Sequence, residues 1–210
     1  LPMMVQRYVA LAYPRASAER EALGHCPLPA LQVDPRQLPA LAEKFNLSRQ
    51  PMLAICPGAE FGPAKQWPVD YYANLARQFI DKDWQVAIMG SPSDVETGED
   101  IASSVDSESI VNLCGETSLE EAIDILSMAE KVVSNDSGLM HIASALNRPL
   151  IALYGPTSAE FTPPLCRDAR ILSVKVDCGP CFQRQCPQGH HKCMTQLGVD
   201  TVINELDAIG

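Results

Sequence analysis

Residues 132–141 read VVSNDSGLMH, and this stretch joins three kinds of local structure. Its apolar start predicts a buried strand, its polar middle predicts a turn, and residues 139–146 have the spacing of a helix. A helix that begins directly after a strand directs its free N–H groups and the positive end of its dipole to one point. Such a point binds phosphate, and Asp136 and His141 place ionisable side chains beside it. An ordinary strand-to-helix connection with an Asp or Ser N-cap explains the same residues.

The alternation of strand and helix continues on both sides of that stretch. Apolar runs predict strands at 52–56, 85–89, 110–113, 131–134, 150–154 and 170–174. Helical spacing and cap residues predict helices at 70–81, 94–104, 117–128, 137–146 and 199–209. Because the strands are short and almost entirely apolar, we predict an α/β fold with a parallel sheet buried between helices.

Residues 1–50 have a different character. Residues 3–12 and 38–45 predict short helices. The five prolines of residues 14–39 prevent long regular structure; these are Pro14, Pro27, Pro29, Pro35 and Pro39. We interpret residues 1–50 as the end of a preceding domain and a connector, and residues 51–210 as a domain of their own. Because the chain begins with Leu1 and not with methionine, we expect it to be a fragment of a longer protein whose N-terminus is missing.

The overall composition excludes several classes of protein. The net charge of −10 argues against a surface for nucleic acid or for an anionic membrane, either of which needs a basic patch. No apolar run approaches the roughly 20 residues of a membrane span, and no signal peptide is visible. We therefore expect a cytoplasmic globular protein that binds no nucleic acid.

The turn that follows the first predicted strand also has features of a phosphate site. Ligands of parallel sheets lie beyond the carboxyl ends of the strands, where this turn falls. Gly58 and Gly62 let the backbone approach a ligand closely, and Lys65 can offset the charge that grows on a departing phosphate. From composition alone, a solvated loop lysine is the simpler explanation for Lys65. The chain has no P-loop and no Gly-x-Gly-x-x-Gly fingerprint, which argues against a nicotinamide enzyme.

Two further ionisable residues are candidates. Glu96 lies in the first turn of the helix after the second strand, where nucleotide-binding sheets often place an acid that holds ribose hydroxyls. Favourable interaction with the helix dipole is the alternative explanation. His141 lies one turn into its helix, so that it either faces the same pocket as Asp136 or packs as an ordinary helical histidine.

The eight cysteines fall into two groups, of which the first is scattered along the chain and consists of Cys26, Cys56, Cys114 and Cys166. Cys56 and Cys114 lie in or beside predicted strands, where a free thiol is a small buried apolar group. The remaining cluster is Cys178, Cys181, Cys186 and Cys193, with His190 and His191 inside it. Such ligands can bind zinc, although the spacing fits no standard zinc finger and no ferredoxin motif. Reduced thiols without a metal are the alternative.

Four runs together resemble the C-terminal half of the ADP-heptose:lipopolysaccharide heptosyltransferases, glycosyltransferase family 9, with the heptosyltransferase II branch the most similar. They are CPGAEFGPAK at 56–65, NDSGLMH at 135–141, ALNRPL at 145–150 and LYGPT at 153–157. The resemblance covers roughly residues 50–210, and residues 1–15 are similar to the close of the first domain.

The resemblance implies a fold and an activity. The fold is a Rossmann-like parallel sheet with helices on both faces, which forms the C-terminal domain of a GT-B glycosyltransferase. That domain binds ADP-heptose, and heptose passes with inversion to the lipopolysaccharide inner core. The acceptor site and the catalytic base belong to the N-terminal domain, which is absent here. The resemblance implies no required cofactor and no catalytic metal, and it allows peripheral association with the inner membrane.

The resemblance also implies roles for particular residues. Lys65 contacts the diphosphate and steadies the leaving ADP, and Asp136 lies nearest the sugar hydroxyls; these two are the predicted catalytic residues. Glu96 holds the ribose, and Thr117 with Ser118 lies beside adenine. The predicted substrate-binding set is Gly58, Lys65, Glu96, Thr117, Ser118, Asp136, Ser137, Gly138, Leu139 and His141.

Two other functions stay open. The chain fits a nucleotide-binding or zinc-stapled module that has no transfer activity of its own. It also fits a related transferase that uses another donor, such as a UDP-sugar.

Overall fold

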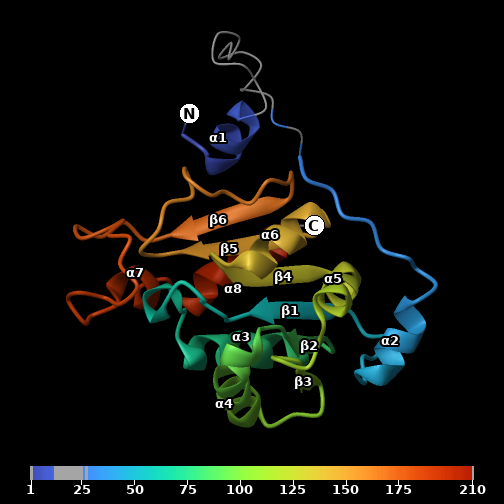
Figure 1. The fold of residues 1–210 in the computed structure, drawn as a ribbon. Coiled ribbons are helices and arrows are strands. Elements are labelled where there is room, and N and C mark those ends of the chain that lie inside the picture. Colours follow the sequence, from blue (N-terminus) through green and yellow to red (C-terminus); the bar gives the residue numbers. More distant parts are fainter. Residues whose placement is uncertain (1, 12–25, 27, 210) are drawn as a thin grey trace.

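The computed structural model describes residues 2–11, 26 and 28–209. A sheet of six parallel strands forms its centre: β1 (Met52–Cys56), β2 (Gln85–Ile88), β3 (Ile110–Asn112), β4 (Lys131–Asn135), β5 (Leu150–Tyr154) and β6 (Ala169–Ser173). Their spatial order is β3-β2-β1-β4-β5-β6, so that the sequence order reverses between β1 and β4. All the carboxyl ends lie on one edge of the sheet, to the left in Figure 1.

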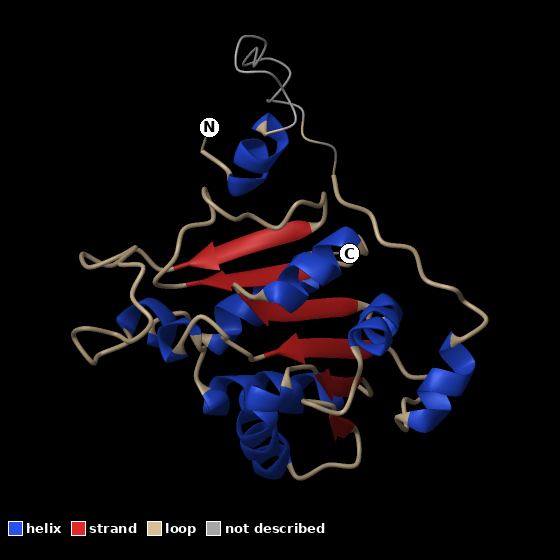
Figure 2. Ribbon diagram, viewed as in Figure 1, coloured by secondary structure: helices blue, strands red, loops and turns tan. Residues whose placement is uncertain are grey.

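Helices cover both faces of the sheet, as Figure 2 shows. They are α3 (Val69–Ile80), α4 (Val95–Val105), α5 (Leu119–Met128), α6 (Gly138–Ala145) and α8 (Val199–Ala208). Side chains alternate between the faces of a strand, so one strand supplies two cores. Leu53 and Ile55 of β1 join the core under α3, α4 and α8, whereas Ala54 and Cys56 join the core under α5 and α6. This arrangement confirms the predicted parallel sheet with helices on both faces.

The helices and strands predicted from residue 52 onward are all present, with ends that differ by at most two residues. Three short elements were not predicted: the 3-10 helices at Pro63–Lys65 and Pro92–Asp94, and the four-residue helix α7 (Lys192–Thr195). Each is a single turn, which is too short to show a periodic apolar pattern.

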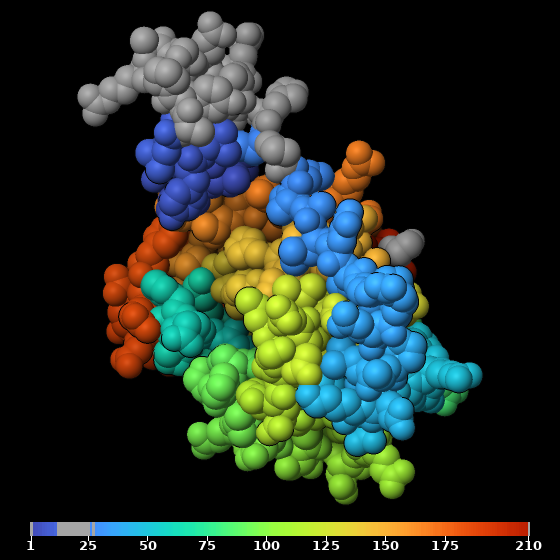
Figure 3. Space-filling view, turned by 45° about the vertical axis from the view of Figure 1, so that its right-hand side comes forward, coloured from blue at the N-terminus to red at the C-terminus, as the bar shows by residue number. Residues whose placement is uncertain are grey.

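The N-terminal region forms two separate helices, α1 (Met4–Ala10) and α2 (Leu38–Lys44). Helix α1 lies beyond β6 in Figure 1, where the Met4 amide donates to the Phe161 carbonyl over 2.9 Å. Helix α2 packs on α5 in Figure 3, and Lys44 Nζ lies 2.5 Å from Glu121 Oε1.

Helices α1 and α2 thus lie within the two ranges predicted for them. The division of the chain at residue 50 stays a prediction. Residue 12, Pro14 and Pro27 lie outside the described residues. Within residues 2–11, 26 and 28–209, no helix is long and apolar enough to cross a membrane.

Candidate functional site

The loops that follow β1 and β4 meet where the strand order reverses. From β1 the chain crosses to β2 on one side, and from β4 it crosses to β5 on the other, so the two loops diverge and leave a crevice between them. Lys65 lies on the first loop and Asp136 on the second. The fold therefore brings Lys65 and Asp136, which are 71 positions apart in the sequence, together at the carboxyl edge of the sheet, which we call the rim.

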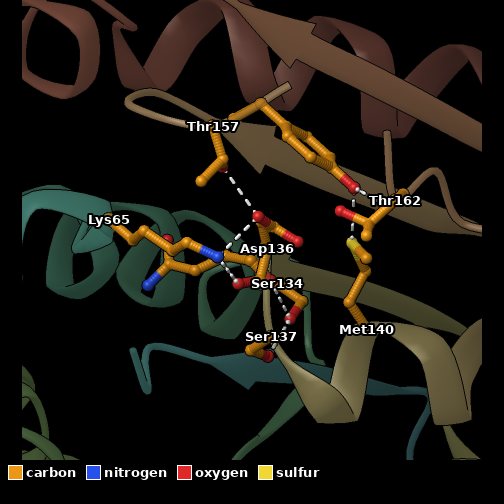
Figure 4. Close-up of polar contacts among 9 residues, drawn as sticks. Lys65, Ser134, Asp136, Ser137, Met140, Thr157 and Thr162 are labelled. Carbon is orange, nitrogen blue, oxygen red and sulfur yellow. Dashed lines mark hydrogen bonds and ion pairs between the residues drawn. The ribbon is translucent and has the colours of Figure 1, made fainter. Parts of the chain in front are cut away.

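Lys65 and Asp136 form an ion pair at this point. Lys65 Nζ lies 2.6 Å from Asp136 Oδ2 and donates to the Asp136 carbonyl oxygen over 3.1 Å. Thr157, on the loop after β5, donates its hydroxyl to the same Oδ2 over 2.7 Å. Figure 4 shows the three side chains converging. The Lys65 and Asp136 side chains are only 12% and 6% exposed, respectively, so their attraction is less screened than that of a surface pair.

A second set of contacts fixes the loop that carries Lys65. The Ala64 amide donates to the Arg184 carbonyl over 3.1 Å, and Gly62 packs so closely on the Arg184 backbone that a Cβ would clash. Gly62 also has a φ of 152°, which favours glycine. Phe61 lies below two cations, 5.0 Å from Lys65 Nζ and 5.7 Å from the Arg184 guanidinium carbon.

The first turn of α6 faces the crevice without a side-chain cap. Ser137 is the N-cap residue, but its side chain makes no capping hydrogen bond and lies 3.2 Å from the Ser134 hydroxyl instead. The cap explanation for Asp136 and Ser137 therefore fails, because neither side chain caps α6 with a hydrogen bond. The N–H groups of this turn and the helix dipole remain directed at any anion placed before the helix.

A cavity of about 390 Å³ lies on the β2 and β3 side of the ion pair. Five predicted binding residues line it, namely Gly58, Thr117, Ser137, Gly138 and Leu139. Leu119, Ala122 and Ile142 supply apolar walls. The cavity thus combines an apolar interior with the free end of α6 at its rim, as expected for a ligand that joins an apolar ring to phosphate.

The structure does not bring every predicted residue into this cavity. Glu96 lies in the first turn of α4 but is exposed and does not line the cavity. Asp94 lines it instead, buried at 8% exposure, and accepts hydrogen bonds from the Ser91 amide and hydroxyl over 2.8 and 2.7 Å. Our sequence analysis missed Asp94, which the Ser-x-x-Asp capping pattern of 91–94 could have revealed.

Ser118, and not its neighbour Thr117, caps α5. Its hydroxyl accepts from the Glu121 amide over 3.2 Å, and the Glu121 carboxylate accepts from the Ser118 amide over 2.9 Å. The hydrogen bond from Lys44 and this reciprocal box both lower the pKa of Glu121. Ser118 does not line the cavity, whereas its neighbour Thr117 does.

His141 is exposed on α6 and does not line the cavity. Desolvation by the surrounding protein lowers its pKa; the Asp136 carboxylate acts to raise that pKa and the Lys65 ammonium to lower it. The imidazole therefore interacts electrostatically with both members of the ion pair, and it is largely neutral at neutral pH.

The C-terminal cysteines gather around a small closed cavity of about 20 Å³. Cys178, Cys181, Cys186 and Cys193 line it together with His190, whose Nε2 lies 3.9 Å from Cys178 Sγ. Hydrogen bonds from backbone N–H groups, led by that of His191, lower the pKa of Cys186. Burial and then the other cysteines raise the pKa of Cys193.

These side chains are not arranged as a ligand set. Over the part of the chain that the structure describes, no three His, Cys, Asp or Glu residues form a group that could hold a metal ion. Cys56 and Cys114 are buried, as predicted, and burial raises the pKa of the Cys114 thiol to about 12.

Comparison with known proteins matches this chain to one family. The family model described as glycosyltransferase family 9 (heptosyltransferase) matches residues 1–192. Lipopolysaccharide heptosyltransferase 2 of Escherichia coli K12 is 42% identical over 99% of this chain, which covers 62% of that protein. Lipooligosaccharide heptosyltransferase 2 of Haemophilus influenzae is 48% identical over 82% of the chain and 52% of its own length.

A solved structure agrees with these matches. The structure of E. coli ADP-heptose lps heptosyltransferase II superposes with a TM-score of 0.87 at 42% identity, covering 99% of this chain and 61% of that one. The chain thus spans about three fifths of its E. coli relative. The matched family model, the identities and the shared fold agree: the chain belongs to glycosyltransferase family 9.

Proposed function

We propose that this chain is the donor-binding half of an inverting heptosyltransferase that transfers heptose from ADP-heptose to the lipopolysaccharide inner core. The observation that carries this proposal is the juxtaposition of Lys65, Asp136 and the uncapped first turn of α6 beside the cavity of about 390 Å³. The relatives named above as heptosyltransferases support the sugar and the acceptor class.

In this proposal, different parts of the site hold the adenine, the ribose and the diphosphate of the nucleotide sugar. The apolar walls formed by Leu119, Ala122 and Ile142 suit the adenine ring. The Asp94 carboxylate lies in the same cavity and can accept a hydrogen bond from a ribose hydroxyl, the role that the sequence suggested for Glu96. The diphosphate then lies before α6, within reach of the N–H groups after Ser137 and of the Lys65 ammonium.

Lys65 and Asp136 have different roles in the transfer. The acceptor oxygen attacks the anomeric carbon of the heptose, the bond from that carbon to the phosphate oxygen breaks, and ADP leaves with the bonding electrons. Negative charge grows on the diphosphate, where the Lys65 ammonium and the α6 dipole stabilise it. Asp136, already held by Thr157, accepts hydrogen bonds from heptose hydroxyls.

The acceptor proton needs a base that this chain does not supply in our proposal. A carboxylate of the N-terminal half takes that proton. The same half holds the lipopolysaccharide acceptor, and the whole enzyme works in the cytoplasm, peripherally associated with the inner membrane. The chain alone therefore binds donor and transfers nothing.

Calorimetric titration of the chain with ADP, UDP and adenosine tests the donor site. We expect ADP to bind more tightly than adenosine, because only ADP reaches Lys65 and α6. UDP should bind at least about tenfold more weakly, because uracil is smaller and more polar than adenine and buries less surface against the apolar walls. Equal binding of ADP and UDP would favour a transferase with another donor, and no binding of any nucleotide would refute the site.

A transfer assay with a protein that also carries the N-terminal half separates an enzyme from a binding module. Heptose should pass from ADP-heptose to an inner-core acceptor, and Lys65→Ala should abolish most of that transfer. A full-length protein that binds ADP but transfers no heptose would support the binding module.

We further propose that the four-cysteine loop can take up zinc as a structural staple, since four thiols and His190 line one closed cavity. Zinc would have to draw the sulfur atoms inward, because they do not form a ligand group as they stand. Metal analysis of protein purified without chelator tests this. About one zinc per chain, lost in Cys178→Ser, supports the staple. Protein that is purified without metal, and whose stability zinc does not change, refutes it.

A further inference from the structure

We propose that Asn135 is a positioning residue, whose side chain clamps both ends of the Lys65 loop and so sets the distance between Lys65 and Asp136. The consequence for ADP rests on the function proposed above, but the clamp itself does not. Asn135 is the last residue of β4 and is completely buried.

The side-chain amide of Asn135 contacts the start and the end of the loop at once. Its Nδ2 donates to the Pro57 carbonyl over 2.7 Å, directly after β1 ends. Its Oδ1 accepts from the Trp67 amide over 3.4 Å, just before α3 begins. One side chain on β4 therefore joins the two points between which the β1 loop emerges and returns.

The surroundings of Asn135 hold the clamp rigid. Oδ1 also accepts from the Tyr72 hydroxyl over 3.1 Å. Tyr72 and Trp67 are buried and pack edge to face with ring centroids 4.9 Å apart, and Trp67 Nε1 donates to the Leu197 carbonyl over 2.8 Å. The Asn135 amide thus uses both its donor and its acceptor atoms, and an unpaired polar group here would be left without water.

The position of Asn135 in the chain links the clamp to the site. Asp136 follows it directly, and Asp136 Oδ2 holds the Lys65 ammonium at 2.6 Å. The Lys65 loop is therefore joined to the β4 end three times: at Pro57, at Trp67 and through the ion pair. Of these, the two contacts of Asn135 persist when a diphosphate draws Lys65 away from Asp136.

Asparagine meets this requirement because it offers a donor and an acceptor from one planar group. Aspartate in its place would direct a carboxylate oxygen at the Pro57 carbonyl, and leucine would have the volume but no polar contact. Asn135→Leu therefore removes the clamp and keeps the packing volume. Tyr72→Phe removes the hydroxyl that donates to Asn135 and also lies 3.4 Å from the Cys56 carbonyl, but it keeps both loop contacts of Asn135 and is the milder variant.

Hydrogen–deuterium exchange of the ligand-free chain tests the clamp. The loop contains hydrogen-bonded amides at Gly62, Ala64, Lys65 and Gln66, which report its order. In Asn135→Leu these amides should exchange about tenfold faster, whereas those of α8 should keep their wild-type rates. Ile101→Ala, a buried change in α4, is the control, because it lowers global stability through a residue that lies outside the loop.

Unchanged protection of the loop in Asn135→Leu would overturn the clamp. If that variant does not fold, Tyr72→Phe decides the question, with an increase of about two- to fivefold expected in the same amides. Wild-type exchange of the loop in Tyr72→Phe would then overturn the proposal.

Ligand titration tests the consequence for the site. Asn135→Leu should weaken ADP by about tenfold and leave adenosine within about twofold, since only ADP needs Lys65. In a Lys65→Ala background, Asn135→Leu should cause no further loss of ADP affinity, because both substitutions remove the same interaction, that between Lys65 and the diphosphate. Equal loss of ADP and adenosine, or full additivity, would refute positioning through Lys65. If the wild-type chain binds no ADP, the proposed function fails, while the exchange experiment still decides the clamp.

Discussion

The two sides of the ligand rim are built in different ways. On the β2 and β3 side, the cavity of about 390 Å³ is formed by turns and first helical residues with apolar walls. Between β1, β4 and β5, the rim is an ion pair with a hydroxyl partner, assembled from three loops that are far apart in sequence. In the function that we propose, the first side selects the ligand by its apolar surface and the second acts through charge. Substitutions on the two sides should therefore have separable effects on adenosine and on ADP.

Lys65→Ala should produce the largest effect. Loss of a charge-assisted contact to the diphosphate costs about 1.5–3 kcal/mol, so ADP affinity should fall by about 10- to 100-fold while adenosine affinity stays unchanged. Calorimetric titration with both ligands measures this. Lys82→Ala is a matched control, because Lys82 is exposed and its ammonium forms a surface ion pair with Asp207 over 3.4 Å. Unchanged ADP affinity in Lys65→Ala would contradict the phosphate role.

Ala122→Phe should affect the other side of the rim. The new ring occupies the cavity from α5, so adenosine and ADP should both weaken by about tenfold, or about 1.4 kcal/mol. Ala122→Ser, which adds little volume, should bind both ligands as the wild-type chain does. If Ala122→Phe weakens ADP and leaves adenosine untouched, the adenine ring does not lie in this cavity.

Asp136→Asn should separate the sugar from the nucleotide. The amide keeps a hydrogen-bonding oxygen for Thr157 but loses the charge that competes with the diphosphate for Lys65. ADP affinity should therefore stay within about threefold of wild type, whereas ADP-heptose should lose its advantage over ADP. Competition titration of the two ligands checks this difference. An equal loss for both would argue against a contact between Asp136 and the sugar.

His141→Gln should give the smallest effect, on pH dependence. The folded chain lowers the pKa of His141 below 6.5, so the unfolded chain takes up this proton first as the pH falls. The wild type therefore loses stability from just above pH 6.5 down through the folded pKa, and His141→Gln should lack this part of the loss. Because the ring is exposed, the difference should stay below about 0.5 kcal/mol. Thermal unfolding at pH 7.5 and 5.5 measures it, and identical pH dependence of the two proteins would refute it.

The cavity side of the rim was the easier one to predict. The resemblance named Thr117, Gly138 and Leu139 as binding residues, and all three lie at helix starts, which caps and apolar spacing predict. The exchange of Glu96 for Asp94 shows the limit of that method. Both acids lie near the start of α4, and only the 3-10 turn at Pro92–Asp94 decides which carboxylate faces inward.

The ion-pair side depended on contacts that no local pattern contains. Thr157 belongs to a quoted motif, yet its hydrogen bond to Asp136 depends on β5 lying beside β4. Asn135 likewise belongs to the 135–141 motif, but its role requires Pro57 and Trp67 to lie across the neighbouring strand. Sequence separation conceals both relationships.

The sequence by itself determined the elements and their class, because apolar periodicity and cap residues act within a few positions of the chain. It also determined that the ligand turns lie at one edge, because parallel strands have their carboxyl ends on the same side. Only the tertiary structure decided that β1 lies beside β4 and that Lys65 therefore meets Asp136. Strand order follows from how helices pack on both faces of the sheet, and that packing sums contacts between residues far apart in the chain.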